Sequence, residues 1–247
     1  MPFSGRIREE RSLRTLAIVQ ARTSSTRLPG KVLKPLAGAP LIVRLLERLR
    51  LCRTLDAVVV ATSLDPSDDP LAAVCEQAGA AVHRGPLNDV LARFVGALDA
   101  FGEADVAVRL TADCPLHDPA VIDRVVLAKR VGAAPYVSNT IPDRTYPVGL
   151  DVEAFDPELL RIAHAESADA YEREHVTPFV YRRPERFALH CERLNAALAD
   201  RRWVVDTAED YDFVARVYDR LHGSKPGFGL ADVLALEAEG LSRRVAP

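Results

Sequence analysis

The sequence has no block of like charge. Its 32 Lys and Arg and 35 Asp and Glu residues are spread over 247 positions and give a formal net charge of −3. Binding to duplex nucleic acid depends on clustered Lys and Arg side chains on the phosphates, so this partner is disfavoured. Hydrophobic residues make up 48% and charged residues 27%, close to the average of globular proteins. We therefore expect a globular chain that does not bind nucleic acid.

Cysteine and long apolar runs are also scarce. The four cysteines show no CxxC spacing and lie mostly in apolar surroundings, which predicts reduced thiols at Cys52, Cys75, Cys114 and Cys191. No apolar run is long enough to cross a bilayer, and the polar start MPFSGRIREERSLRT contains no stretch of signal-peptide length. These absences predict a cytoplasmic protein without a membrane partner.

Short apolar runs alternate with segments of helical spacing in the first half of the chain. Strands are expected at 16–21, 57–61, 81–83 and 106–110, and helices at 41–49, 70–78 and 90–101. Such alternation predicts an α/β fold, a Rossmann-like three-layer sandwich with a mixed, mostly parallel sheet. Ligands of such sheets bind outside the carboxyl ends of the strands. The loops that follow 21 and 110 are therefore expected on the ligand side.

The pattern also predicts the domain organisation. Residues 1–14 are expected to form a flexible leader, 15–222 a single catalytic domain, and 223–247 an appendage with one helix at 231–239. The alternation weakens after residue 119. There we expect helices at 158–165, 171–181 and 210–221, and strands at 136–138, 150–155, 187–191 and 203–205.

The segment QARTSSTRLPGKVL, residues 20–33, concentrates cations and hydroxyls in one loop after a predicted strand. Arg22, Arg27 and Lys31 can neutralise a triphosphate, while the hydroxyls and backbone amides donate hydrogen bonds. Gly30 allows close approach of the backbone. The Walker spacing is absent. The alternative is a solvated turn with incidental charges, but its position at a strand end favours a phosphate-binding loop.

Two further segments place a carboxylate directly after a predicted strand. In RLTADCPLHDP, Asp113 can ligate Mg²⁺, whereas Asp118 before Pro119 is the better candidate for a helix cap. In RRWVVDTAEDYDFV, the local pattern favours a helix cap at Asp206 or Thr207. A role for Asp206 as a metal ligand would be favoured only if a second carboxylate lay beside it.

Together these segments resemble the cytidylyltransferases that activate acidic sugars, the CMP-ketodeoxyoctonate and CMP-sialate synthetases, and above all the spore coat polysaccharide biosynthesis protein F group. The resemblance runs from about 16 to 241 and rests on six motifs in the same order, QARTSSTRLPGKVL, ATSLDPSDDP, TADCPL, YVSNTIPDRTYPVGLDVE, REHVTP and RWVVDTAEDY. Ala112 stands where the group usually has glycine, and Ala208 where it usually has proline. Neither departure removes a charged group.

The resemblance implies the fold of the nucleotide-diphospho-sugar transferases and a reaction in which CMP passes from CTP to an anionic acceptor, with release of pyrophosphate. It implies Mg²⁺ between Asp113 and Asp206, and catalytic roles for Arg22, Lys31 and Asp113. It also suggests a homodimer. The expected CTP-binding residues are Ala21, Arg22, Ser25, Arg27, Gly30, Lys31, Asp89, Arg93 and Asp113, of which Asp89 and Arg93 have the alternative of a solvated helix face.

The acceptor is expected to bind between residues 139 and 153 and near 174–175. The candidate residues are Asn139, Arg144, Tyr146, Asp151, Glu174 and His175. Arg144 is the natural partner of an acceptor carboxylate or phosphonate, with an exposed loop arginine as the alternative. Glu174 and His175 are candidates to line the site or to orient a proton acceptor, with a structural histidine or one at a subunit contact as the alternative for His175.

Two other functions are compatible with the pattern. A glycosyltransferase shares a similar sheet and metal carboxylates, but usually places a DxD pair on its metal. A catalytically silent nucleotide-binding protein would retain the fold without turnover. The presence of all three loop cations and both aspartates argues against the silent protein.

Overall fold

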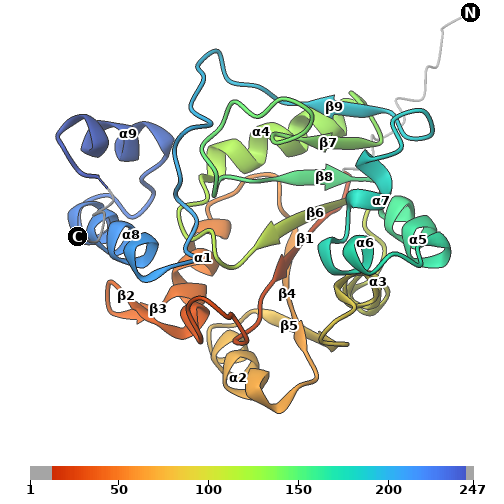
Figure 1. The fold of residues 1–247 in the computed structure, drawn as a ribbon, viewed down its shortest axis with the longest axis horizontal. Helices are drawn as coiled ribbons and strands as arrows, with labels where there is room; N and C mark the ends of the chain where they lie inside the picture. The colour runs from red at the N-terminus through yellow and green to blue at the C-terminus, as the bar shows by residue number, and fades with distance from the viewer. Residues whose placement is uncertain (1–12, 243–247) are drawn as a thin grey trace, which may run out of the picture.

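A computed structural model describes residues 13–242 and contains a central seven-stranded sheet. The strand order is β5-β4-β1-β6-β8-β7-β9 (Figure 1). Their bounds are β1 Thr15–Gln20, β4 Ala57–Ser63, β5 Ala81–Gly85, β6 Val106–Thr111, β7 Tyr136–Ser138, β8 Glu153–Phe155 and β9 Leu189–Cys191. Only β8 runs antiparallel to its neighbours, so the predicted mixed, mostly parallel sheet is confirmed.

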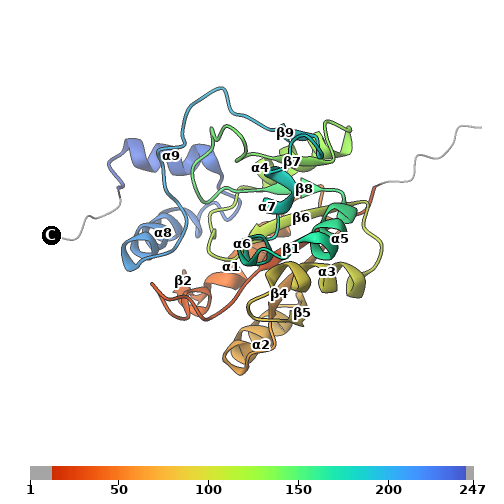
Figure 2. The ribbon, with the colours of Figure 1, turned by 45° about the vertical axis from the view of Figure 1, so that its right-hand side comes forward.

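Helices cover both faces of the sheet because successive strand residues point to opposite sides. In β1, Ala17 and Val19 pack into a core that includes side chains of α1 (Leu41–Leu49), α2 (Asp69–Gln77) and α4 (Pro119–Arg130). Leu16 and Ile18 pack on the other face against α3 (Val90–Phe101), α5 (Pro157–Glu166) and α7 (Pro178–Tyr181). Figure 2 shows the same arrangement from a second direction. The result is the three-layer sandwich that the alternation predicts.

Two predicted elements of the second half differ in the structure. The helix expected at 171–181 is divided into α6 (Ala170–His175) and α7, because Val176 has a φ of 74° and Pro178 cannot continue a helix. The strand expected at 203–205 does not form. The backbone next to it instead runs beside the loop around Gly149, through one isolated parallel bridge between Val148 and Arg202.

A third apolar cluster lies beside the sheet and includes the end of the described chain. Trp203 packs there with residues of α8 (Ala208–Leu221) and α9 (Leu230–Ala238), such as Phe213 and Val233. Figures 1 and 2 both place α8 and α9 together at one end of the molecule. The predicted helix at 231–239 therefore corresponds to α9. Most of the predicted leader lies outside the described residues.

Short elements complete the fold. Between β1 and α1 lie the 3₁₀ helix η1 (Lys31–Leu33) and the two-stranded ribbon β2 (Pro35–Leu36) and β3 (Ala39–Pro40), and η2 (Pro66–Asp68) precedes α2. Among residues 13–242, no helix is long and apolar enough to cross a membrane.

Candidate active site

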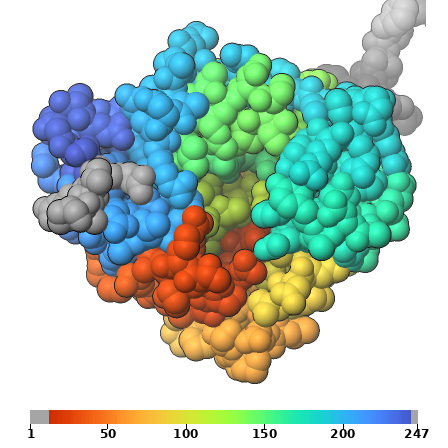
Figure 3. Space-filling model, in the orientation of Figure 1, coloured from red at the N-terminus to blue at the C-terminus, as the bar shows by residue number. Residues whose placement is uncertain are grey.

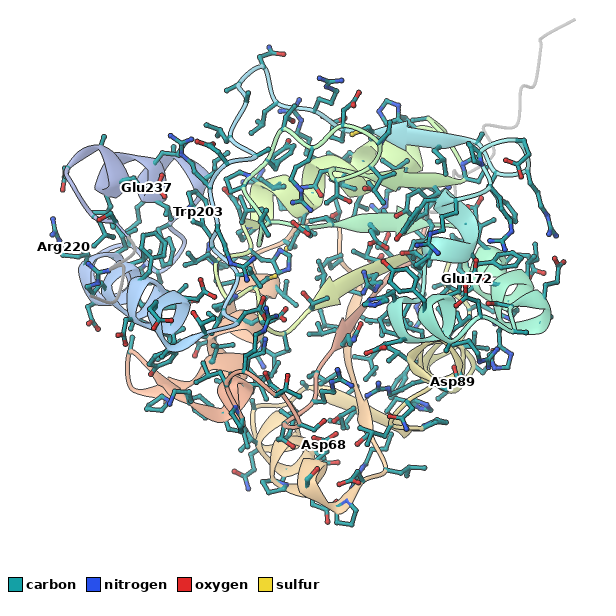
Figure 4. All side chains as sticks on the ribbon, viewed as in Figure 1. Asp68, Asp89, Glu172, Trp203, Arg220 and Glu237 are labelled. Atoms are coloured by element: carbon teal, nitrogen blue, oxygen red, sulfur yellow. The ribbon has the colours of Figure 1, made fainter. Side chains whose placement is uncertain are left out.

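The loop after β1 is held in place by a buried carboxylate from the neighbouring strand connection. Asp68 Oδ1 accepts hydrogen bonds from the backbone N–H and the hydroxyl of Thr23, both at 2.7 Å, and Oδ2 accepts one from the backbone N–H of Ser63. The Ser63 hydroxyl also donates to Oδ2. Burial alone would raise the pKa of Asp68, but the hydrogen bonds from Ser63 and Thr23 outweigh it and lower the pKa. Asp68, labelled in Figure 4, therefore acts as a charged anchor for the cation-rich loop.

Lys31 is the buried centre of the site. It begins η1 directly after Gly30, whose φ of 67° is the left-handed conformation that favours glycine. Its Nζ donates to Asp113 Oδ2 and Asp206 Oδ1, each at 3.0 Å, and to the carbonyl oxygen of Val205 at 2.7 Å. The carboxylates of Asp113 and Asp206, which lie far apart in the sequence, thus both contact the ammonium group of Lys31.

Asp206 and Thr207 have different roles at the start of α8. Thr207 is the N-cap of α8, with its hydroxyl accepting from the backbone N–H of Asp210, and Asp210 completes a capping box. Of the two predicted cap candidates, Thr207 is the cap, and the carboxylate of Asp206 points to Lys31. The capping role predicted for Asp118 is confirmed at α4, where Oδ1 accepts from the backbone N–H of Ala120.

Three cations surround the Asp206 carboxylate. Besides Lys31, Arg27 lies 2.9 Å and Arg202 2.5 Å from Oδ2. Burial by itself raises the pKa of Asp206, but Lys31, Arg202 and Arg27 outweigh this effect and lower it below its usual value. Asp206 therefore carries its charge at neutral pH. Arg202 was not among the predicted site residues.

A cavity of about 380 Å³ opens over these residues. The space-filling view shows a hollow in the middle of this face (Figure 3), between the loop after β1 and the segment around α6. Of the predicted residues, Ala21, Arg22, Ser25, Arg27, Lys31, Asp113, His175 and Asp206 line it. Six residues that were not predicted also line the cavity: Gln20, Ser24, Thr26, Val32, Thr111 and Ala112. In the sequence, only their nearness to the predicted site residues indicates that they lie in the site.

From α6, His175 lines the cavity, whereas the predicted Glu174 does not and instead pairs with a lining residue. Glu174 lies 3.6 Å from Arg22 in an ion pair that is half exposed to solvent. Burial, with the nearby charges of Arg109, Arg182 and Arg22, lowers the pKa of His175, although Glu174 opposes the shift. His175 is therefore neutral at pH 7 and able to accept a proton.

The residues predicted to bind an acceptor between 139 and 153 hold the loop together. The Asn139 amide donates to the carbonyl of Leu150 and accepts from the backbone N–H of Val152. Arg144 makes a two-pronged ion pair with Asp151, at 2.5 and 2.8 Å. Tyr146 is fully buried in the core. None of these side chains lines the cavity described above.

Asp89 and Arg93 are not among the residues that line the cavity. Asp89 caps α3 by accepting from the backbone N–H of Ala92, and its other oxygen accepts from Arg173 at 2.8 Å (Figure 4). Arg93 is fully buried, and its Nε and Nη1 have no hydrogen-bond partner among the described residues. Burial lowers the pKa of Arg93, against the opposing effect of Asp68. The alternative of a solvated helix face is wrong for Arg93, because its guanidinium is enclosed.

Burial of His117, in the loop after Asp113, is expected to make the stability of the protein depend on pH. The side chain is 1% exposed, neither ring nitrogen has a partner among the described residues, and burial lowers its pKa from 6.5 to about 4. Between pH 6.5 and pH 4, His117 is therefore protonated in the unfolded chain but stays neutral in the folded protein. Stability falls by about 2 kcal/mol between pH 7 and pH 5 from this group alone.

We expect His117→Leu to reduce this loss of stability on acidification. The measurement is urea unfolding of both proteins at pH 7 and pH 5. An identical pH dependence in the two proteins would show that His117 is not the titrating group.

Comparisons with known proteins agree with this geometry. A family model described as cytidylyltransferase matches residues 16–224. The spore coat polysaccharide biosynthesis protein SpsF of Bacillus subtilis is 33% identical over 232 residues, 90% of this chain and 92% of that protein. A 3-deoxy-manno-octulosonate cytidylyltransferase of Anaeromyxobacter sp. is 40% identical over 121 residues, 48% of each chain.

A solved structure extends the likeness to the fold. A cytidylyltransferase from Leptospira borgpetersenii superposes with a TM-score of 0.88 at 28% identity, covering 95% of this chain and 99% of that one. The cation-rich loop and both converging aspartates lie within the region that the family model matches. With its fold and motifs in agreement, this chain belongs to the cytidylyltransferase family and is a nucleotidyltransferase.

Proposed function

We propose that this enzyme transfers CMP from CTP to an acidic sugar or a similarly small anionic acceptor, with Mg²⁺ and with release of pyrophosphate. The observation that carries the proposal is the meeting of Lys31 Nζ with Asp113 and Asp206 at 3.0 Å each, on the floor of a cavity that Arg22 and Arg27 also line. Cations over two carboxylates suit a triphosphate that binds together with a divalent ion.

The donor set fits a metal that is shared with the substrate. Mg²⁺ usually binds through one or two carboxylates plus phosphate oxygens and waters. Asp113 and Asp206 supply two such carboxylates, and no group of three or more His, Cys, Asp or Glu among residues 13–242 forms a complete protein site. When bound, the ion would neutralise charge on the phosphates. Asp113 and Asp206 would hold it.

The remaining residues of the cavity provide positioning and charge. Arg22, Arg27 and Lys31 offset the negative charge that collects on the leaving pyrophosphate. Arg27 pairs with Asp206 Oδ2 in this structure, and its movement onto a phosphate would leave Arg202 as the remaining partner of that oxygen. The neutral imidazole of His175 can accept the proton of an acceptor hydroxyl as it attacks the α-phosphorus in line.

Names of relatives support an acidic sugar as acceptor. One relative is a 3-deoxy-manno-octulosonate cytidylyltransferase, and the other acts in spore coat polysaccharide biosynthesis by name. For Arg144 to bind the acceptor anion, that anion must replace Asp151 on the guanidinium. Arg22 already lines the cavity and offers a second cation for the same purpose.

The proposal is tested by pyrophosphate release with Mg²⁺, CTP and a panel of sugar acids, amino-sugar acids and phosphonates. CTP is compared with ATP, GTP and UTP at equal concentration. We expect release with CTP and at least one acidic acceptor, and little with the other nucleotides. Absence of release with every acceptor would favour the catalytically silent protein.

Cellular location and assembly belong to the same proposal. All four cysteines are free thiols in the structure, as expected in the reducing cytoplasm. The homodimer rests on the family resemblance, and light scattering of the purified protein measures it.

A further inference from the structure

The last described helix lies outside the segment that the family model matches, yet it contacts the segment that leads to Asp206. The model ends at residue 224, and α9 begins at Leu230. In Figure 4 the labelled side chains of Trp203 and Glu237 lie side by side, the first on the segment that leads to Asp206 and the second on α9. This contact connects α9 to one of the two carboxylates.

Glu237 binds this segment with both carboxylate oxygens. Oε1 accepts from Trp203 Nε1 at 2.8 Å, and Oε2 accepts from Arg201 Nε at 3.0 Å. Trp203 is 1% exposed, so its indole N–H depends on this single acceptor for a hydrogen bond in the protein interior. A charged acceptor makes the bond stronger than a neutral one.

The segment from Arg201 to Asp206 joins both carboxylate loops. The backbone N–H of Val205 donates to the carbonyl oxygen of Asp113 at 2.8 Å, and the carbonyl oxygen of Val205 accepts from Lys31. On its other side, the backbone N–H of Trp203 donates to Val148 at 2.7 Å. A displacement of this segment would therefore move Asp206 and disturb Asp113 and Lys31.

The segment also has little room to shift. A Cβ atom added at Gly149 would come within 2.6 Å of the Val204 nitrogen, so the two backbones are in close contact. Asp206 lies three positions after Trp203, so the chain between them spans at most about 11 Å. The indole hydrogen bond thus fixes one end of a short, tightly packed connection whose other end carries the carboxylate.

We propose that Glu237 is a positioning residue, which through Trp203 sets the place of Asp206 relative to Asp113 and so determines how well the enzyme binds its metal together with CTP. The inference deepens the proposed function and rests on it for the identity of the ligands. Residues that orient metal ligands affect metal affinity or activity by about 10- to 100-fold when replaced.

The alternative is that Glu237 only attaches α9 to the protein, and a matched control separates the two. Glu239, the residue that caps the end of α9, pairs with Arg220 of α8 at 3.1 Å, and both side chains are more than half exposed. Glu239→Ala removes a contact between α8 and α9 without touching the segment from Arg201 to Asp206. It should leave metal binding and turnover unchanged.

The experiment compares Glu237→Ala, Glu237→Gln and Glu239→Ala in the full chain. Calorimetry measures CTP binding with EDTA and with Mg²⁺, and kinetics measure kcat, KM for CTP and the Mg²⁺ concentration at half activity. We expect Glu237→Ala to reduce the Mg²⁺-dependent gain in CTP affinity and to raise the Mg²⁺ requirement by about 10-fold. Glu237→Gln keeps an acceptor for Trp203 and should restore most of both.

The outcomes distinguish this inference from the proposed function. A Glu237→Ala protein that melts at a lower temperature but binds CTP and Mg²⁺ as the wild type does overturns the positioning role, as does an equal effect of Glu239→Ala. If the wild type binds CTP but shows no turnover, the proposed transfer reaction fails, while the calorimetry still decides the positioning role. If the wild type does not bind CTP at all, both are overturned.

Discussion

Replacement of Asp113 by alanine is expected to reduce turnover by about 100- to 1,000-fold while the fold stays intact. The side chain is 28% exposed, lies on the cavity floor and accepts a 3.0 Å hydrogen bond from Lys31. The loop itself is held by main-chain contacts, since the carbonyl of Asp113 accepts from Val205 and the N–H of Cys114 donates to Thr111. Loss of the carboxylate therefore removes a metal ligand and few structural contacts.

The measurement is kcat with saturating CTP and Mg²⁺, together with thermal unfolding by circular dichroism. Asp212→Ala on the exposed face of α8 serves as the control, because it removes a carboxylate that does not line the cavity. Full-rate turnover in the Asp113→Ala protein would refute the metal assignment. Unfolding at room temperature would show instead that Asp113 is needed for the fold.

Replacement of Lys31 by alanine is expected to weaken CTP binding by about 100-fold. Lys31 is 7% exposed, and its ammonium lies between Asp113 and Asp206. Without it, two carboxylates face the incoming triphosphate and repel it as well as one another. Asp206 retains Arg27 and Arg202 as partners, so the folded structure should survive.

Calorimetry of CTP binding in Mg²⁺ tests this expectation. Lys34→Ala is the matched control, because Lys34 lies three positions later and its Nζ contacts the ring of Tyr211 at 5.1 Å instead of the carboxylates. Equal CTP affinities of the wild type and the Lys31→Ala protein would remove Lys31 from the triphosphate site. Equal losses in both variants would indicate a general effect of net charge.

The local sequence pattern was sufficient to place those site residues that directly follow a strand of the sheet. The apolar runs of β1 and β6 are short and continuous, so the loops that follow them could be placed at one edge of the sheet, where Lys31 and Asp113 meet. The convergence of Asp206 on the same point could not be obtained from its own segment. There the pattern permits a cap at either of two positions, and only the long-range partners decide between them.

Long-range polar contacts explain most of what the pattern missed. Asp68 anchors Thr23 across 45 positions, and Glu237 reaches Trp203 across 34, distances at which no periodicity connects the residues. Arg144 pairs with Asp151 within an irregular loop, which the hydrogen bond from the Asn139 side chain to the carbonyl of Leu150 holds in place. In each case the partner is fixed by tertiary packing instead of local spacing.

Product analysis tests the central claim most directly. The purified protein is incubated with CTP, Mg²⁺ and each acidic acceptor, and the products are identified by mass spectrometry. The account predicts a new compound whose mass equals the acceptor joined to CMP with loss of water, together with pyrophosphate, and its formation at least about 100-fold more slowly by the Asp113→Ala protein. Formation of CMP and pyrophosphate without any acceptor conjugate, or formation of the conjugate by the Asp113→Ala protein at the wild-type rate, would contradict it.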